Sequence, residues 1–183
     1  MLLNIFNELI FAHKSSKKTI PVYENTADRK KAADNVILNH TAWAAAVGVV
    51  PFVNVDMFAI SALQLDMVRK LADIYGIDFE QNKGRATIIS LFGSGMAGFG
   101  TRMVRWIPII GLPLGGLTMT VMAGTTTYAT GEAFRRHFES GGTFLDIDFT
   151  KIQAFFKENF EKGRIIVENL QGHREMVEFE EVV

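Results

Sequence analysis

The sequence predicts an all-α protein, a helical bundle built of two apolar helical hairpins with amphipathic helices at the N- and C-terminal ends. Apolar residues recur at helical spacing in several segments, and prolines and glycines fall where helices start and stop. No segment shows the strict alternation typical of a half-buried strand. The 183 residues suit one domain with a sizeable core. We therefore expect a single domain over 1–183, with an N-terminal helix at 1–20, an apolar helical core at 27–145, and a helix with an acidic tail at 150–183.

The N-terminal 20 residues are expected to form an amphipathic helix. Apolar side chains share one face of this helix, and three lysines follow it, at Lys14, Lys17 and Lys18. Such a helix can lie on an anionic membrane surface, or it can dock on the protein's own core or on a neighbouring subunit. The segment lacks the basic start and the cleavage site of a signal peptide, so we expect a cytoplasmic origin.

The first apolar hairpin consists of two helices, expected at about 27–50 and 56–75. Pro51 ends the first helix, and Asn54 or Asp56 is expected to cap the second. Gly76 then ends the second helix. Both helices are apolar near their connection and charged at their outer ends, and neither apolar half is long enough to span a bilayer alone.

Three polar residues lie on or near the apolar part of the second helix. Asp56 and Gln64 are candidate functional residues, because a polar side chain within a membrane-inserted helix usually serves a function. Helix capping is the alternative role for Asp56. Asp66 is interpreted as the start of the helix's charged end.

The second apolar hairpin contains two uncharged runs, 86–101 and 106–131, around which the rest of the chain is organised. A capping box at Asp78 and Gln81 predicts a helix at 79–105, and Pro113 predicts another at about 113–139. These helices are expected to be buried, either in lipid or against other helices.

Small residues at four-residue spacing mark both helices of this hairpin. Such spacing lets helix backbones approach closely, which matters most in lipid. The expected helix-packing residues are Gly93, Ser94, Ala97, Gly98, Thr101, Gly116, Thr120 and Gly124. The run at 93–100 also matches the glycine pattern of dinucleotide sites, but the acidic residue needed about 20 positions later is missing.

Polar and aromatic residues of the hairpin suggest two further roles. The threonine-rich helix could line a wet lumen in an oligomer, with Asp56, Gln64, Thr120 and Thr127 as the candidate polar residues. Arg102, Arg105 and Trp106 lie at the bend, where basic and aromatic residues suit a membrane interface. An apolar hairpin with a polar loop is also how a soluble bundle buries its central helices.

The C-terminal helix is expected at about 150–170. A capping box at Thr150 and Gln153 starts it, and its aromatic and aliphatic residues fall mostly on one side. The tail that follows, EMVEFEEVV, is acidic and either frays or pairs with a basic partner.

The composition excludes several kinds of chemistry. The chain has no cysteine, so it has neither disulfides nor thiolate chemistry, and its net charge of −1 argues against nucleic acid as a partner. The four histidines (13, 40, 137 and 173) have no spacing that indicates a metal site, and each is interpreted as a solvent-exposed or core residue. We therefore expect no catalytic residues, no cofactor and no metal.

The order of several segments resembles a known family. NHTAWAAAVGVVPFVNVDMFAISALQLDMVRKLADIYGIDF, ATIISLFGSGMAG, IPIIGLPLGG and YATGEAFRRHFESGGTF are similar to the YcjF-like domain of unknown function of bacteria, often found beside or fused to a GTPase domain. The similarity covers about 30–145. It implies a helical, membrane-associated domain with an accessory role near a GTPase, and it implies no catalytic residues. This chain has no GTPase domain, so any GTPase is a separate protein.

These observations favour a membrane-associated, self-assembling helical protein that serves a GTPase or a membrane-remodelling partner. Its expected location is the bacterial inner membrane, or the cytoplasm with peripheral membrane association. One alternative is an oligomeric channel lined by the threonine-rich helix. Another is a soluble helical lipid-binding or scaffold domain, and an enzyme is not expected.

Overall fold

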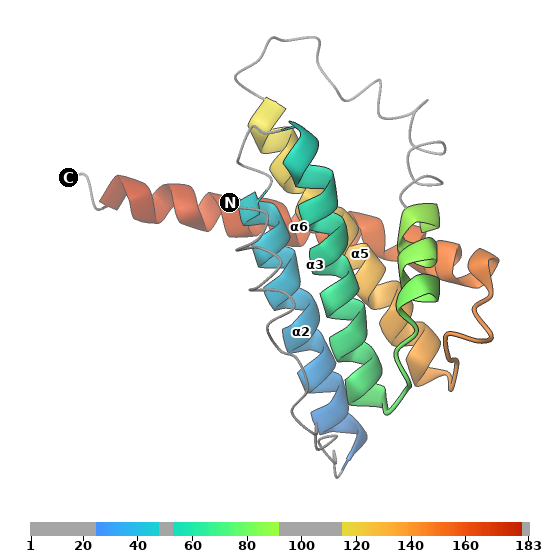
Figure 1. Ribbon diagram of the computed structural model, residues 1–183. Coiled ribbons are helices and arrows are strands. Elements are labelled where there is room, and N and C mark those ends of the chain that lie inside the picture. Colours follow the sequence, from blue (N-terminus) through green and yellow to red (C-terminus); the bar gives the residue numbers. More distant parts are fainter. Residues whose placement is uncertain (1–24, 48–52, 92–114, 181–183) are drawn as a thin grey trace, which may run out of the picture.

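A computed structural model describes residues 25–47, 53–91 and 115–180, with side chains placed at 25–46, 60–91 and 120–172. The described residues are helical apart from short turns and contain no strand, so the predicted all-α class is confirmed (Figure 1). The helices are α2 (Thr26–Val47), α3 (Val53–Tyr75), an unlabelled helix at 81–91, α5 (Gly115–Glu139) and α6 (Phe149–Glu180).

Helix α5 lies at the centre of the bundle and contacts α2, α3 and α6. In Figure 1, α2 and α3 lie side by side in front of α5, and α6 crosses behind it. The C-terminal part of α6 extends beyond the other described helices. The threonine-rich part of the uncharged run at 106–131, which was predicted to be buried, thus lies in α5, the helix around which the others pack.

Side-chain pairs fix the directions of the helices. On α2 and α3, His40 lies beside Asp66 and Arg29 lies over the ring of Tyr75, so these helices are antiparallel. On α3 and α5, Gln64 bonds to Thr127 and Tyr75 bonds to Glu139, so these helices run parallel. The chain therefore has to return to the start of α3 before α5 begins.

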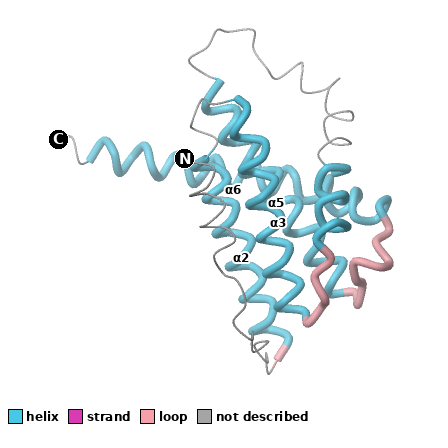
Figure 2. The backbone as a smooth tube through the Cα atoms, viewed as in Figure 1, coloured by secondary structure: helices cyan, strands magenta, loops and turns pink. Residues whose placement is uncertain are grey.

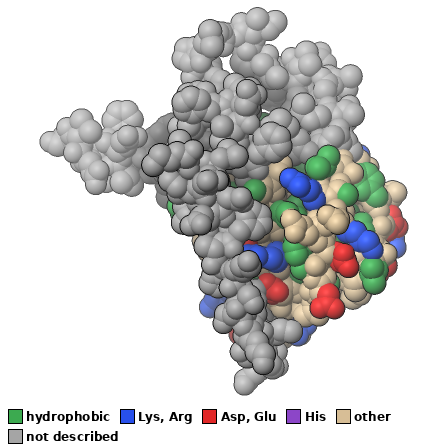
Figure 3. Space-filling view, viewed as in Figure 1, with side chains coloured by type: hydrophobic (Ala, Val, Ile, Leu, Met, Phe, Trp, Pro, Cys, Tyr) green, Lys and Arg blue, Asp and Glu red, His purple; other side chains and the backbone are tan. Residues whose placement is uncertain are grey.

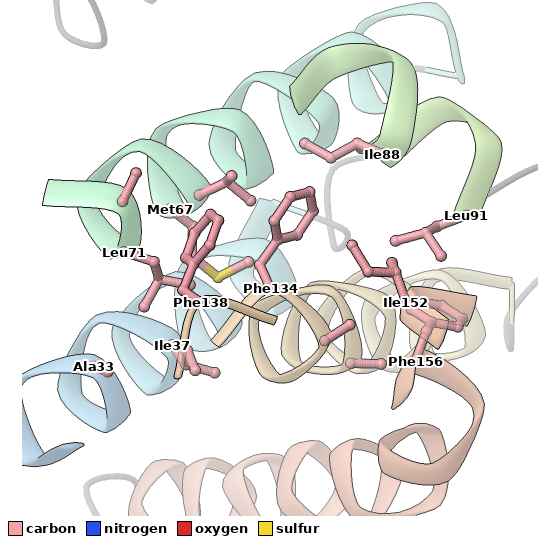
Figure 4. Packing of buried hydrophobic residues seen from close by; sticks show 14 of the residues in the cluster. Ala33, Ile37, Met67, Leu71, Ile88, Leu91, Phe134, Phe138, Ile152 and Phe156 are labelled. Atoms are coloured by element: carbon pink, nitrogen blue, oxygen red, sulfur yellow. The ribbon is translucent and has the colours of Figure 1, made fainter. Parts of the chain in front are cut away.

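The main hydrophobic core joins all five described helices (Figure 4). Its phenylalanines come from α5, α6 and the loop between them, and the ring centroids of Phe134, Phe138 and Phe144 lie within 5.4–6.1 Å of one another. Each helix contributes labelled residues to this core: Ala33, Ile37, Met67, Leu71, Ile88, Leu91, Phe134, Phe138, Ile152 and Phe156. Burying one such large side chain stabilises the fold by about 1.5–3 kcal/mol.

Two helix ends agree with the glycine signals in the sequence. Gly76 and Gly141 have positive φ values of 69° and 84°, which only glycine adopts readily, and they follow α3 and α5. The amide of Ile77 bonds to the carbonyl of Ala72, which closes the end of α3. The turns that include these glycines lie at the lower end of the bundle (Figure 2).

Helix starts differ more from expectation. Helix α3 begins at Val53, so the predicted start near 56 is wrong and Asp56 lies inside the first turn. Helix α6 begins at Phe149, and Asp148 Oδ1 accepts hydrogen bonds from the amides of Thr150 and Lys151, so the cap is Asp148 rather than Thr150. Aspartate is preferred over threonine at this position of a helix.

Two other caps were not predicted correctly. At α2, Asn25 Oδ1 accepts from the amide of Asp28 while the Asn25 amide group donates to the Asp28 carboxylate, a reciprocal pair that sequence reasoning missed. The helix at 81–91 begins with the Gly84 amide bonded to the Glu80 carbonyl, and no side-chain hydrogen bond of Asp78 is found within the described segment. The predicted capping box at Asp78 and Gln81 is therefore wrong.

No helix within 25–47, 53–91 and 115–180 is both long and apolar enough to cross a bilayer. The predicted N-terminal helix at 1–20, with Lys14, Lys17 and Lys18, lies outside the described residues. The same holds for these members of the second hairpin: Gly93, Ser94, Ala97, Gly98, Thr101, Arg102, Arg105 and Trp106.

Candidate functional site

The bundle has one end that is almost free of charge. Residues 36–47 of α2, 53–65 of α3 and 115–131 of α5 contain a single Asp, Glu, Lys or Arg residue, Asp56. Ala44, Ile60 and Ala123 join these segments in one buried cluster. At 1.5 Å per residue, the uncharged part of α5 extends about 25 Å along the bundle. We call this region the charge-poor end.

The opposite end carries the charges. Residues 26–34 of α2, 66–75 of α3 and 132–139 of α5 meet there, as the contacts of Arg29 with Tyr75 and of Tyr75 with Glu139 show. Helix α6 crosses between the two ends, and its outward face carries ion pairs such as those of Arg164 with Glu161 and Glu168. In the bundle of α2, α3 and α5, the charged residues are therefore concentrated at one end and nearly absent from the other.

Threonines of the charge-poor end point into the protein. Gln64 and Thr127 are buried, and the Gln64 amide donates to the Thr127 hydroxyl across 3.2 Å. The hydroxyl of Thr126 donates to the carbonyl of Met122 in its own helix, at 2.8 Å. Thr120 is also buried. In the single chain, the candidate lumen residues with described side chains therefore face other helices and line no lumen.

Glycines mark the closest approaches of α5. A Cβ atom at Gly124 would lie 2.6 Å from Val167 Cγ2 of α6 and 3.2 Å from Ala45 Cβ of α2. At Gly131 it would lie 2.8 Å from Ile37 Cγ1 of α2. Gly124 is one of the expected helix-packing residues, whereas Gly131 was not among them. Gly116 belongs to α5, and its surroundings are outside the described residues.

At the charged end, Asp66 connects α3 to α2. Its carboxylate lies 2.6 Å from both Arg69 Nη2 and Lys70 Nζ, and 3.2 Å from His40 Nε2. Burial raises the pKa of Asp66, but hydrogen bonds and the charges of Lys70 and Arg69 outweigh it and hold that pKa well below its usual range. Asp66 thus does more than begin the charged end of its helix.

The hydrogen-bond geometry shows which ring nitrogen of His40 carries a hydrogen. Its Nδ1 lies 2.6 Å from the carbonyl oxygen of Val36, which can only accept, so Nδ1 carries the hydrogen. Nε2 then donates to Asp66 when the ring is charged, or accepts from Lys70 at 3.4 Å when it is neutral. The buried His40 is therefore a structural histidine with two alternative partners.

A second ionic cluster is centred on Arg135 of α5. The guanidinium makes a two-pronged contact with Glu132 at 2.6 and 3.2 Å and bonds to Glu139 at 2.8 Å. Burial lowers the pKa of Arg135, and the two carboxylates more than reverse this and raise it. Glu139 also accepts from the hydroxyl of Tyr75, whose pKa is raised by burial and by that carboxylate. The Arg135 guanidinium and the Tyr75 hydroxyl therefore keep their protons over the usual pH range.

A groove of about 360 Å³ opens between α2, α5 and α6 beside this cluster. This volume is near the lower limit for small-molecule sites. Its walls are Asp34, Ile37 and Leu38 of α2, then Tyr128, Glu132, Arg135 and Arg136 of α5, and Asn159, Lys162 and Ile166 of α6. In the view of Figure 3, acidic and basic side chains are interspersed with hydrophobic ones over the described surface.

Sequence reasoning did not single out the residues of this groove. One available signal was the pair Glu132 and Arg135, charges three residues apart that directly follow an uncharged run. The other was Asn159, a polar residue among the phenylalanines of α6. Among the described residues, no group of three or more His, Asp and Glu side chains is placed to hold a metal ion.

The chain matches a family model over residues 22–164, described as "Domain of unknown function (DUF697)". The chain belongs to this family. The match includes α2, α3, α5 and the first half of α6, and it confirms the resemblance to a bacterial helical domain of unknown function.

One relative of this DUF697 protein is "Magnetosome membrane protein 22" of Magnetospirillum gryphiswaldense. It is 33% identical over 164 residues, which cover 86% of this chain and 84% of the relative. No solved structure matches the chain. This name places the relative, rather than this chain, at a membrane.

Proposed function

We propose that this DUF697 protein is a membrane-associated helical scaffold without enzymatic activity, whose charge-poor end contacts the bilayer. The main observation behind this proposal is the uneven distribution of charge along the bundle. One end, formed by residues 36–47, 53–65 and 115–131, contains a single charged residue, Asp56. Apolar surface is favourable in contact with lipid, and charges are costly there.

Two further observations support this proposal. The relative that covers most of the chain is named a membrane protein. Trp43, at the charge-poor end of α2, is 66% exposed, and tryptophan is favoured where membrane meets water. The run at 92–101, which follows the helix at 81–91, contains no charged residue and supports the same proposal.

The finer parts of the proposal are self-assembly and service to a separate GTPase or membrane-remodelling partner. Self-assembly is supported by the small-residue spacing at 93–101. The GTPase partner is supported by the resemblance to a domain that accompanies GTPases.

A soluble lipid-binding scaffold is the second candidate, favoured by the central position of α5, whose uncharged surface is largely covered by α2, α3 and α6. A pore has less support. Thr120 and Thr127 are buried against other helices, so a pore requires the bundle to open.

Fractionation of cells that express the full chain separates these candidates. The proposal predicts that the protein sediments with membranes, and carbonate extraction then distinguishes a peripheral protein, which is released, from an integral one, which needs detergent. A monodisperse protein in the soluble fraction without detergent would contradict membrane association and favour the soluble scaffold.

A matched pair of variants tests which end of the bundle contacts the membrane. Trp43→Ser removes an exposed aromatic side chain at the charge-poor end, and Leu145→Ser removes an exposed apolar side chain, 76% exposed, in the loop that follows the charged end of α5. Trp43→Ser is expected to lower the membrane-bound fraction and Leu145→Ser to leave it unchanged. Equal effects, or a larger effect of Leu145→Ser, would contradict the assigned orientation.

A further inference from the structure

Exposed hydrophobic side chains lie on both sides of the groove between α2, α5 and α6. Leu38, on the α2 wall of the groove, is 43% exposed. On α6, Ile165 and Leu170 are 51% and 40% exposed. They follow, by one turn of the helix, Lys162 and Ile166, which form the α6 wall. Exposed apolar side chains that gather in this way mark a surface at which another molecule binds.

Three contacts with α5 give the order of residues along this surface. They are Asp34 with Arg135, Ile37 with Gly131, and Gly163 with Tyr128. The three partners on α5 follow one another from the charged end toward the charge-poor end. Leu38 and Lys162 are the chain neighbours of Ile37 and Gly163, so Leu38 lies between Asp34 and Lys162.

Two opposite charges on this surface lack a close partner among the described residues. Lys162 is exposed and makes no ion pair with any of them. The side chain of Asp34 is 43% exposed, and its carboxylate reaches Arg135 Nε only at 4.0 Å. Lys30, one turn before Asp34 on α2, is exposed and forms no ion pair with it in the described structure. A free carboxylate and a free ammonium thus lie on opposite sides of Leu38.

The guanidinium beside Asp34 leaves room for a second cation. Arg135 is bound by Glu132 in a two-pronged contact and by Glu139 at 2.8 Å. With Asp34, three carboxylates share this one guanidinium, which leaves the group with a net negative charge. An ammonium that reaches Asp34 from outside is therefore attracted rather than repelled by these four side chains.

The surface is complementary to itself. A two-fold axis through Leu38 exchanges its two sides, so that Lys162 of each copy meets Asp34 of the other and the two Leu38 side chains pack together. We propose that this surface joins two copies of the chain in a symmetric dimer. Ile165 and Leu170 become buried at the edge of the contact. This inference rests on the proposed self-assembly and deepens it by naming the surface and the ion pairs.

Charge reversals test the pairing by sedimentation velocity on the full-length protein, in detergent if extraction requires it. The wild type is expected to sediment as a dimer. Asp34→Lys and Lys162→Asp are each expected to weaken this dimer at least about tenfold, because each puts like charges at both contacts. An equimolar mixture of the two variants is expected to dimerise again, since both contacts of the mixed pair join opposite charges.

Two further variants complete the set. Lys157→Asp, a reversal at an exposed lysine of α6 that does not line the groove, is the matched control and should leave the dimer unchanged. Leu38→Glu places two carboxylates beside the axis and is expected to give a monomer. Circular dichroism checks that each variant is helical, and recovery in the mixture shows that both reversed chains are folded.

Three outcomes would overturn the proposal. They are a monomeric wild type, a dimer that neither reversal weakens, and a mixture that stays as weak as its components, which would mean that the reversals do not act across the contact. An oligomer that survives both reversals keeps the proposed self-assembly and loses this surface. A monomer that sediments with membranes loses self-assembly and keeps the proposed membrane association, so these failures are distinguishable.

Discussion

The amide of Gln64 donates a hydrogen bond to the hydroxyl of Thr127 across 3.2 Å, in the buried contact between α3 and α5. These residues are far apart in the sequence, and their hydrogen bond fixes the axial register between two parallel helices. A polar pair in an apolar contact specifies one register, because sliding either helix by a turn leaves both groups without a partner.

Thr127→Val is expected to destabilise the fold by about 1–3 kcal/mol, because it leaves the buried Gln64 amide unpaired. The double variant Gln64→Leu with Thr127→Val removes both polar groups and is expected to cost less than the sum of the single changes. Thermal unfolding of all four proteins, followed by circular dichroism, measures this coupling. Additive effects would show that the bond does not contribute.

Gly124→Ala is expected to destabilise the bundle by about 1–3 kcal/mol, because the new methyl group meets Val167 at 2.6 Å and forces α5 and α6 apart. Gly172→Ala is the matched control on α6, where a Cβ atom has nothing within 4 Å. It should be neutral or stabilising, since alanine favours a helix by up to about 1 kcal/mol over glycine. Denaturant midpoints measure both changes, and equal midpoints would contradict a tight contact.

Asp66→Asn is expected to lower stability by about 1–3 kcal/mol near neutral pH, because Arg69, Lys70 and His40 lose a carboxylate partner. The pKa of Asp66 is lower in the folded protein than the unfolded value of about 3.9, so its contribution is complete above that pH and is lost as the pH falls below about 4.

The measurement for Asp66 is unfolding at a series of pH values. The difference in unfolding free energy between the wild type and Asp66→Asn should narrow below about pH 4. The control is Glu161→Gln, which breaks the exposed ion pair with Arg164 and should cost no more than about 1 kcal/mol at any pH. A difference in unfolding free energy that does not narrow at all between pH 4 and pH 2.5 would mean that packing, rather than charge, accounts for the effect.

Asp148→Ala is expected to destabilise α6 by about 1 kcal/mol, because two amides at the start of the helix lose their acceptor. Thr150→Ala should cost less, as its side chain is not the cap. Melting temperatures of the two variants provide the comparison, and the reverse order would restore the cap expected from the sequence.

Much of this fold is predictable from local patterns. The turns at Gly76 and Gly141 and the extent of α5 follow from helix signals, which depend on neighbouring residues. The caps were harder, because Asp148 and Thr150 are both acceptable caps, and the hydrogen bonds of two amides to Asp148 decide between them.

The candidate site was less predictable, because it depends on contacts between distant segments. Nothing near Asp34 in the sequence indicates that it faces Lys162 across a groove, since this depends on how α2 and α6 cross. Helix period alone does not say whether a threonine faces lipid, a lumen or another helix, and only packing shows that Thr127 meets Gln64.

The parallel run of α3 and α5 has a consequence for synthesis. Helices α2 and α3 are neighbours in the sequence and can pair early, whereas α5 begins 40 residues after α3 ends. At about 5–20 residues per second, the ribosome leaves the face of the first hairpin that carries Ile37 and Met67 uncovered for several seconds. A nascent chain with this topology has a time window in which a chaperone or a bilayer can bind that face before α5 covers it.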